Sequence, residues 1–159
     1  MSELHSQMRK VLEISSNLVP VFSFSETPLT EIRKLYAKER KFWNSGGPQL
    51  TTILDTQVKG PVGAIPICIY HPDPEQCLPV LVYLHGGGFV LGSIDTHDRI
   101  MRELAFRSGC AVIGVEYSLS PEQKFPFAIE ETLSVLKWMK QDLQRKDNSA
   151  FNIDPERVA

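Results

Sequence analysis

The segment His85-Gly86-Gly87-Gly88-Phe89 holds the residues whose types and spacing are best suited to chemistry. It directly follows residues 79–84, an apolar run typical of a strand buried on both faces. Three consecutive glycines allow the backbone to turn so tightly that several N–H groups point at one spot, and such a nest binds negative charge. The C-terminal end of a strand in an open parallel sheet is also where ligands collect. We therefore expect this glycine loop to bind a ligand or take part in catalysis.

One interpretation of the loop is an oxyanion hole, formed by the backbone N–H groups of Gly86, Gly87 and Gly88. Ester hydrolysis passes through a tetrahedral intermediate whose oxygen carries developing negative charge. Fixed N–H donors stabilise that charge more than the neutral carbonyl, and removing one donor costs about 2.7–4 kcal/mol, or roughly a hundred- to thousandfold in rate. His85 is then expected to orient the loop by hydrogen bonds and not to act as the catalytic base.

Two other interpretations of the glycine cluster remain open. The pattern Gly86-x-Gly88-x-x-x-Gly92 follows a strand, and Glu116 ends the next strand, as in a loop that binds a dinucleotide. That fingerprint needs glycines that lead directly into a helix N-terminus, whereas here we expect the helix to begin several residues later, with Asp95 as its N-cap. The third interpretation is a glycine-rich turn without a ligand.

A catalytic nucleophile is not evident in these residues, because no Gly-x-Ser-x-Gly motif occurs in the sequence. Ser93, Ser118 and Ser120 are near the glycine loop but lack the strand–turn–helix context that activates a nucleophile. His97 and Asp98 are adjacent on an expected helix, where neighbouring side chains do not face each other. We therefore predict structural roles for all five, and no metal-ligand spacing is found.

Composition and charge are those of an ordinary globular protein. Of the 159 residues 42% are hydrophobic and 23% charged, and 17 Lys and Arg against 19 Asp and Glu give a net charge of −2. The basic run from Arg33 to Lys41 alternates with Glu31 and Glu39, which is typical of the solvated face of a helix. We expect no nucleic-acid partner, no signal peptide and no membrane contact. The three cysteines are expected to be free thiols: Cys68, Cys77 and Cys110.

Residues 1–47 are predicted to form a helical segment. Apolar residues recur at helical spacing over residues 4–18. A second amphipathic helix is expected from Pro28, which suits the first helical position, to Gly46-Gly47.

Residues 48–159 are predicted to form an α/β core with a mostly parallel sheet. Residues 50–58 and 64–70 favour a hairpin, and Pro66 places it toward a sheet edge because proline cannot donate a ladder hydrogen bond. The apolar runs 79–84 and 110–115 are typical of parallel strands, with a helix from Thr96 to Arg107 between them.

The C-terminal part of this core is expected to contain a helix and the start of a strand. The helix is predicted from Pro126 to about Leu143, and a strand is expected to begin after Asn152. The predicted buried stripe of the helix comprises Ile129, Leu133, Leu136, Met139 or Lys140, and Leu143.

These motifs together resemble a known family. The runs 83–92, 95–99 and 116–122, the last followed by Phe125-Pro126, are similar to the hormone-sensitive-lipase-like branch of the α/β hydrolases and, within it, to bacterial cytoplasmic acetyl esterases. The resemblance extends to residues 40–44 and so covers nearly the whole chain. It implies the N-terminal half of an α/β-hydrolase fold, preceded by a helical cap over an acyl pocket.

The resemblance also implies roles in the site. The backbone of Gly86 and Gly87 would form the oxyanion hole, with Gly88 allowing the turn and His85 shaping it. Glu116 stands where the family usually has aspartate. The residues implied to support the loop from below are Tyr117, Pro121 and Glu122.

In the family, the next element is a strand that ends in a Gly-Asp-Ser-Ala-Gly elbow, which would lie roughly five residues beyond Ala159. We therefore expect none of the Ser-His-Asp triad among these residues. In the family, the strand that bears the nucleophile pairs with the outer edge of strand 80–84. Because its elbow would lie beyond Ala159, we expect this edge to be unpaired.

By resemblance, the expected function is the hydrolysis of acetyl or other short acyl esters by a Ser-His-Asp mechanism, in the cytoplasm and without a cofactor or metal. The family implies a homodimer, with a maltose-regulon activator and an α-galactosidase as regulatory partners. The 159 residues alone are expected to be inactive. A non-enzymatic binding module and a dinucleotide-binding domain are the alternative functions.

Overall fold

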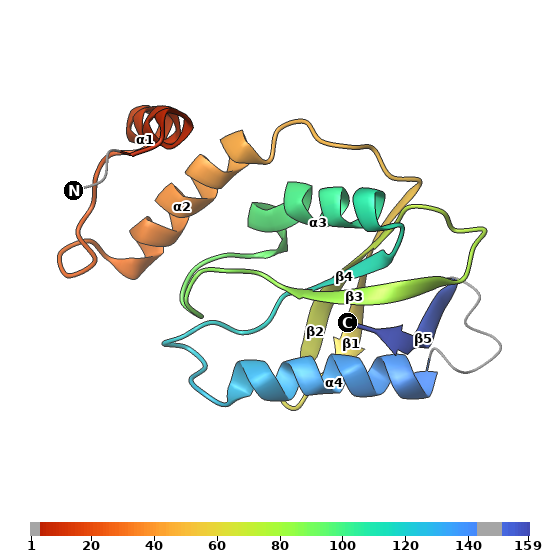
Figure 1. The fold of residues 1–159 in the computed structure, drawn as a ribbon. Coiled ribbons are helices and arrows are strands. Elements are labelled where there is room, and N and C mark those ends of the chain that lie inside the picture. Colours follow the sequence, from red (N-terminus) through yellow and green to blue (C-terminus); the bar gives the residue numbers. More distant parts are fainter. Residues whose placement is uncertain (1–3, 143–150) are drawn as a thin grey trace.

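Five strands form a single mixed sheet in the computed structural model, which describes residues 4–142 and 151–159 (Figure 1). They are β1 (Thr52–Lys59), β2 (Ala64–His71), β3 (Leu78–Leu84), β4 (Ala111–Val115) and β5 (Ile153–Val158). Their order across the sheet is β1-β2-β4-β3-β5. The β1–β2 hairpin is antiparallel and lies at one edge, as predicted, and β3 is parallel to both β4 and β5. The predicted α/β class is confirmed.

Helices cover both faces of the sheet because its central strands are apolar on both sides. α3 (Ile94–Ser108) lies on one face and α4 (Phe127–Asp142) on the other (Figure 1). The isoleucines of β2 belong to a core cluster with Val135 and Met139 of α4. The alternate residues Cys68 and Tyr70 pack with Met101 of α3. Every residue of β4 is buried, which is the pattern predicted for a covered parallel strand.

The predicted unpaired edge along strand 80–84 is wrong. β5 runs parallel to β3, with Leu78 opposite Ile153 and Val80 opposite Val158. Ala159 extends the pairing, since its N–H donates to the Val80 carbonyl (2.9 Å) and its carbonyl accepts from the Val82 N–H (2.9 Å). Residues 153–159 therefore pair with β3 along this edge as far as Val82.

The predicted buried stripe of α4 is wrong at two of its positions. Ile129 and Leu133 are each 47% exposed, whereas Val135 and Met139 are buried. The face toward the sheet also carries Glu131, a buried carboxylate that accepts hydrogen bonds from the N–H and the hydroxyl of Ser118. This polar contact helps to turn the face of Glu131, Val135 and Met139 toward the sheet, which apolar spacing alone did not indicate. Leu143, the last predicted member of the stripe, lies outside the described residues.

The N-cap of α3 is Ser93, not Asp95 as predicted. Ser93 has an extended backbone, and its hydroxyl accepts from the Thr96 N–H (3.1 Å) while the Thr96 hydroxyl accepts from the Ser93 N–H (2.8 Å). This reciprocal pair is a capping box. Asp95 is the second residue of the helix and lies in its first turn. At the other end Gly109 has φ +68°, the left-handed conformation common for a glycine that ends a helix.

Ser93→Ala is therefore expected to lower the free energy of unfolding by about 1 kcal/mol. The alanine removes the acceptor of the Thr96 N–H and leaves that group unpaired. Asp95→Ala is the matched control, because it removes only a favourable charge near the helix N-terminus, worth about 0.3–1 kcal/mol. Urea unfolding measures both. A larger loss for Asp95→Ala than for Ser93→Ala would contradict the assignment of the cap.

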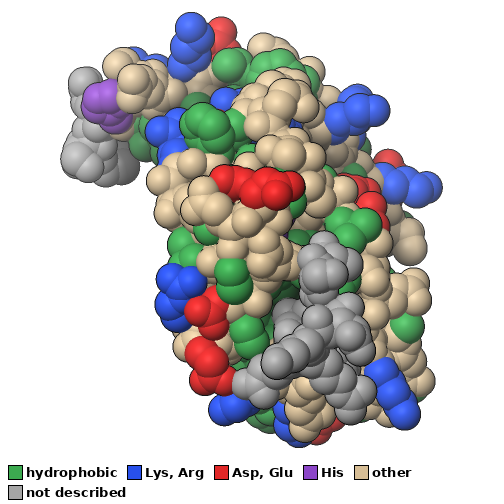
Figure 2. Space-filling view, turned by 90° about the vertical axis from the view of Figure 1, so that its right-hand side faces the viewer, with side chains coloured by type: hydrophobic (Ala, Val, Ile, Leu, Met, Phe, Trp, Pro, Cys, Tyr) green, Lys and Arg blue, Asp and Glu red, His purple; other side chains and the backbone are tan. Residues whose placement is uncertain are grey.

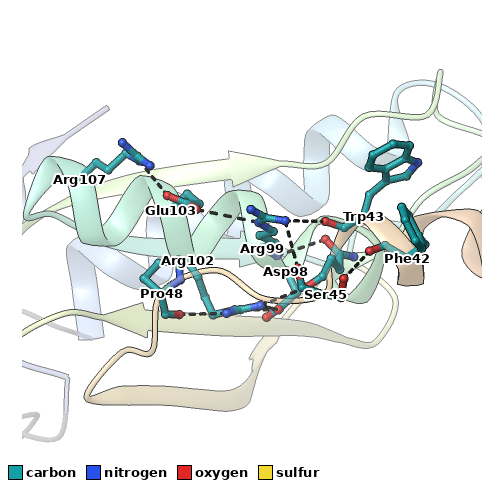
Figure 3. A network of polar contacts seen from close by, with 10 residues as sticks. Phe42, Trp43, Ser45, Pro48, Asp98, Arg99, Arg102, Glu103 and Arg107 are labelled. Carbon is teal, nitrogen blue, oxygen red and sulfur yellow. Dashed lines mark hydrogen bonds and ion pairs between the residues drawn. The ribbon is translucent and has the colours of Figure 1, made fainter. Parts of the chain in front are cut away.

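The N-terminal helices α1 (Ser6–Leu18) and α2 (Leu29–Trp43) precede the sheet, and Pro28 is the N-cap of α2 and not its first residue. A polar network links the segment after α2 to α3 (Figure 3). Arg99 donates to the Ser45 carbonyl (3.0 Å) and Arg102 to the Pro48 carbonyl (2.9 Å). Asp98 holds the Arg102 guanidinium at 2.8 Å. The helical segment is thus attached to the core by side chains of α3.

Within residues 4–142 and 151–159, no helix is long and apolar enough to cross a membrane. The face in Figure 2 shows lysine and arginine side chains interspersed with acidic ones. The cysteines of the described chain are free thiols, as predicted.

Candidate functional site

The glycine loop presents three backbone donors in a row at the C-terminal end of β3. The backbone turns through positive φ at Gly87 (+135°), Gly88 (+63°) and Phe89 (+61°). The turn is closed by the N–H groups of Val90 and Leu91, which both donate to the Gly87 carbonyl (3.1 and 2.9 Å). Within the described part of the chain, the N–H groups of residues 86–88 donate no hydrogen bond. The loop therefore has unused donors where an anion could bind.

Glycine is required at two positions of this loop for steric reasons. A Cβ atom on Gly87 would overlap the Leu91 carbonyl. A Cβ atom on Gly92, at φ +97°, would overlap the Gly86 carbonyl and the His85 ring. Gly92 was not among the predicted site residues. The sequence indicates its place in a glycine pattern, but only the folded loop shows that it packs against Gly86.

His85 and Tyr117 form a stacked aromatic pair under the loop. Their ring centroids are 4.2 Å apart, with 13° between the planes, and both side chains are buried. The Nδ1 atom of His85 lies 3.1 Å from the Gly86 carbonyl, and the Tyr117 hydroxyl donates to the His85 carbonyl. The structure thus brings His85 and Tyr117 together at the first glycine, where both were expected to act.

The segment after β4 contacts the far side of the loop. The Ser120 N–H donates to the Phe89 carbonyl (2.7 Å), and the Ser120–Pro121 peptide is cis. The Glu122 carboxylate binds a side chain outside the loop. It is bound by Arg33 of α2, whose guanidinium also donates to the Val90 carbonyl (2.9 Å).

The prediction of a purely solvated basic face on α2 is therefore wrong for Arg33. Its side chain is only 26% exposed and contacts both the glycine loop and the Tyr117–Glu122 segment. Lys34, the next residue, fits the prediction, since its side chain is 77% exposed and its ion-pair partner is Glu31, at 4.0 Å. Charge alternation along a helix gives the same pattern for both residues.

The three serines near the loop have structural partners, as predicted. Ser93 caps α3, Ser118 donates to Glu131 (2.8 Å), and Ser120 donates to the Gln123 carbonyl (3.1 Å). None of these hydroxyls has a histidine partner within the described residues. His97 and Asp98 also diverge as predicted: His97 bonds with Thr96, and Asp98 pairs with Arg102. No cluster of potential metal ligands occurs among the described residues.

The geometry disfavours the dinucleotide interpretation. The N-terminus of α3 is capped by the Ser93 hydroxyl, and residues 89–92 stand in the sequence between the glycine donors and that cap. Glu116, the candidate ribose ligand, instead accepts from the Ile94 N–H at 2.7 Å. The Glu116 carboxylate thus binds the first residue of α3. Burial raises the pKa of the Glu116 carboxyl, and the Ile94 hydrogen bond opposes that shift.

An apolar cavity of about 260 Å³ adjoins the glycine loop. Its walls come from the loop itself, from the segment after β4 and from the start of α4, including Phe89, Phe125, Pro126 and Ile129. Helices α1 and α2 do not line it. α2 contacts the loop through Arg33.

The lowered pKa values of two buried histidines indicate how the free energy of unfolding depends on pH. His85 and His97 have ring centroids 5.6 Å apart, and burial lowers the pKa of each below 6.5. Below pH 6.5 the unfolded chain therefore binds more protons than the folded one, so the free energy of unfolding falls as the pH drops toward the folded pKa values. The raised pKa of Glu116 has the opposite sign, because the folded chain keeps that proton at pH values above 4.5, where the unfolded chain loses it.

We expect urea unfolding to show lower stability at about pH 5.5 than at pH 7, with a smaller difference in the double variant His85→Gln and His97→Gln. An equal pH dependence in the double variant would show that other groups cause it.

Comparisons with known proteins agree with this fold. Residues 81–159 match a family model described as the α/β hydrolase fold. An acetyl esterase of Salmonella agona is 39% identical over 154 residues, which is 97% of this chain and 46% of that protein. The chain thus spans about half the length of the curated relatives it matches.

Solved esterase structures give the same picture. A hyperthermophilic esterase from Pyrobaculum calidifontis superposes with a TM-score of 0.83 at 32% identity, over 99% of this chain and 49% of that one. An ester hydrolase from the Lake Arreo metagenome, solved with a bipyridine phosphonate derivative, gives 0.83 at 29% identity, over 99% and 50%. The sheet, its flanking helices and these matches together show that the chain has the α/β-hydrolase fold.

Proposed function

We propose that these residues are part of a carboxylic ester hydrolase for short acyl esters and that they supply its oxyanion hole. The observation that carries the proposal is the row of unused N–H groups at Gly86, Gly87 and Gly88, at the C-terminal end of β3. Such donors stabilise the oxygen of a tetrahedral intermediate because they are already in place when its negative charge develops.

The surroundings of the loop support this role. Preorganised donors need a backbone that does not rearrange during the reaction. Here the Gly87 carbonyl is bound by two N–H groups, the Phe89 carbonyl by Ser120, and the His85 carbonyl by Tyr117. The loop is therefore restrained at its start, its turn and its end.

The size of the cavity beside the loop is consistent with a substrate that has a small acyl group. Its volume of about 260 Å³ lies just below the range of typical small-molecule sites, about 300–1,000 Å³. Acetyl esterase is also the name of curated relatives such as the Salmonella agona protein. In this proposal residues 1–47 form a cap, residues 48–159 form the first part of the hydrolase core, and the Ser-His-Asp triad comes from residues outside the 159.

The test is a fusion protein in which these 159 residues replace the matching part of the Salmonella agona acetyl esterase and are followed by the rest of that protein. We expect it to hydrolyse p-nitrophenyl acetate and to prefer it to p-nitrophenyl laurate. A folded fusion protein without esterase activity would contradict the proposed function. The unmodified acetyl esterase is the positive control for assay and folding.

A further inference from the structure

Arg33 connects α2 with two separate segments of the candidate site. Its Nε atom donates to the Val90 carbonyl at 2.9 Å, in the glycine loop. Its Nη2 atom donates to the Ser120 carbonyl at 2.8 Å, in the segment after β4. The same guanidinium binds both carboxylate oxygens of Glu122, at 2.7 and 2.9 Å. One side chain thus satisfies acceptors that are far apart in the sequence.

The two carbonyls bound by Arg33 belong to segments that are also bonded to each other. The Ser120 N–H donates to the Phe89 carbonyl at 2.7 Å, one residue before Val90. Val90 in turn donates its N–H to the Gly87 carbonyl and so closes the turn that contains the free donors. Val90 is therefore bound at both of its backbone polar groups: its carbonyl accepts from Arg33, and its N–H donates to the Gly87 carbonyl.

The charges of this contact persist at neutral pH. Arg33 holds the pKa of the Glu122 carboxyl at about 2, well below its usual range. The planar fork of a guanidinium can serve several acceptors at fixed angles, whereas a lysine ammonium acts as a point charge.

We propose that Arg33 is a positioning residue, which fixes the glycine loop in its donor-presenting conformation from the cap helix α2. Its effect on the reaction rate rests on the proposed esterase function, but its effect on the loop does not. The cap segment would then be part of what keeps the donors in place and not only a cover over the substrate.

Hydrogen exchange on the 159-residue chain tests the effect on the loop. In Arg33→Gln, the amides of Val90, Leu91 and Ser120 should exchange about tenfold faster, while the amides of β4 stay unchanged. Arg33→Lys should leave these amides fast, because the charge remains but the fork is lost. Lys34→Gln is the matched control, one residue away on the same helix, and should change none of them.

Two results would overturn the proposal. One is unchanged exchange at Val90, Leu91 and Ser120 in Arg33→Gln. The other is a rise of equal size in β4, which would show global destabilisation and not a local release of the loop. Full restoration by Arg33→Lys would likewise show that charge alone suffices and would refute the role of the fork.

Kinetics of the fusion protein test the effect on the reaction. Arg33→Gln should lower kcat on p-nitrophenyl acetate about tenfold with KM little changed, because misplaced donors weaken binding of the transition state only. A raised KM with unchanged kcat would overturn the positioning role. Faster loop exchange in Arg33→Gln, combined with an unaffected kcat in Gly87→Ala, would support the contact with the loop and refute the oxyanion hole.

Discussion

Gly87→Ala in the fusion protein is expected to lower kcat on p-nitrophenyl acetate by about a hundredfold or more. The added Cβ would overlap the Leu91 carbonyl, and Gly87 has φ +135°, a conformation that alanine rarely adopts. The turn must therefore shift, and the donors of residues 86–88 move away from the substrate oxygen. Steady-state kinetics measure the loss.

A control must separate this loss from the cost of a strained backbone. Gly46→Ala serves, because Gly46 also has positive φ (+76°) but no atom lies within 4 Å of its added Cβ, and it is remote from the glycine loop in the sequence. We expect kcat to be unchanged in Gly46→Ala. Equal kcat values for Gly87→Ala and the parent fusion protein would mean that the oxyanion is stabilised elsewhere.

The second large effect is expected from the 159-residue chain by itself, which should show no serine-dependent hydrolysis. Its rate on p-nitrophenyl acetate should lie below that of the fusion protein by on the order of 10⁶, as when a whole triad is removed. The reason is that the hydroxyls of Ser93, Ser118 and Ser120 are engaged in structural hydrogen bonds.

A serine-directed organophosphate distinguishes true turnover from background. It should label the fusion protein and leave the 159-residue chain unlabelled. Labelling of the chain at a serine, together with turnover that the label abolishes, would contradict this account and would place a nucleophile among these residues.

The position of the glycine loop could be predicted because its signal is local. The loop is contiguous in sequence and follows directly on an apolar strand, so neither long-range pairing nor side-chain packing had to be known. The same holds for β4, whose uninterrupted apolar run indicates burial on both faces. The end of α3 at Gly109 follows from the conformational freedom of one residue.

Choices between similar local signals could not be made from sequence. Ser93 and Asp95 are both good N-caps, and the capping box with Thr96 decides for Ser93 only once the backbone is in place. On α4, apolar spacing favoured the face of Ile129 and Leu133. Glu131 faces the sheet instead because it satisfies Ser118, a residue on a different element.

Contacts between segments that are distant in the sequence could not be predicted either. Arg33 lies 57 residues from Val90 and 87 from Ser120, and nothing in the charge pattern of α2 separates it from its exposed neighbour Lys34. The pairing of β5 with β3 joins Val158 to Val80 and depends on the arrangement of the whole sheet. Sequence periodicity describes single elements and contains little information about such partners.

The most direct test of the oxyanion hole is a crystal structure of the fusion protein after reaction with a short-chain phosphonate ester, whose phosphoryl oxygen imitates the oxyanion. We expect this oxygen to lie about 2.7–3.1 Å from at least two of the backbone nitrogens of Gly86, Gly87 and Gly88. A phosphoryl oxygen bound by other donors, with these three N–H groups still unused, would contradict it.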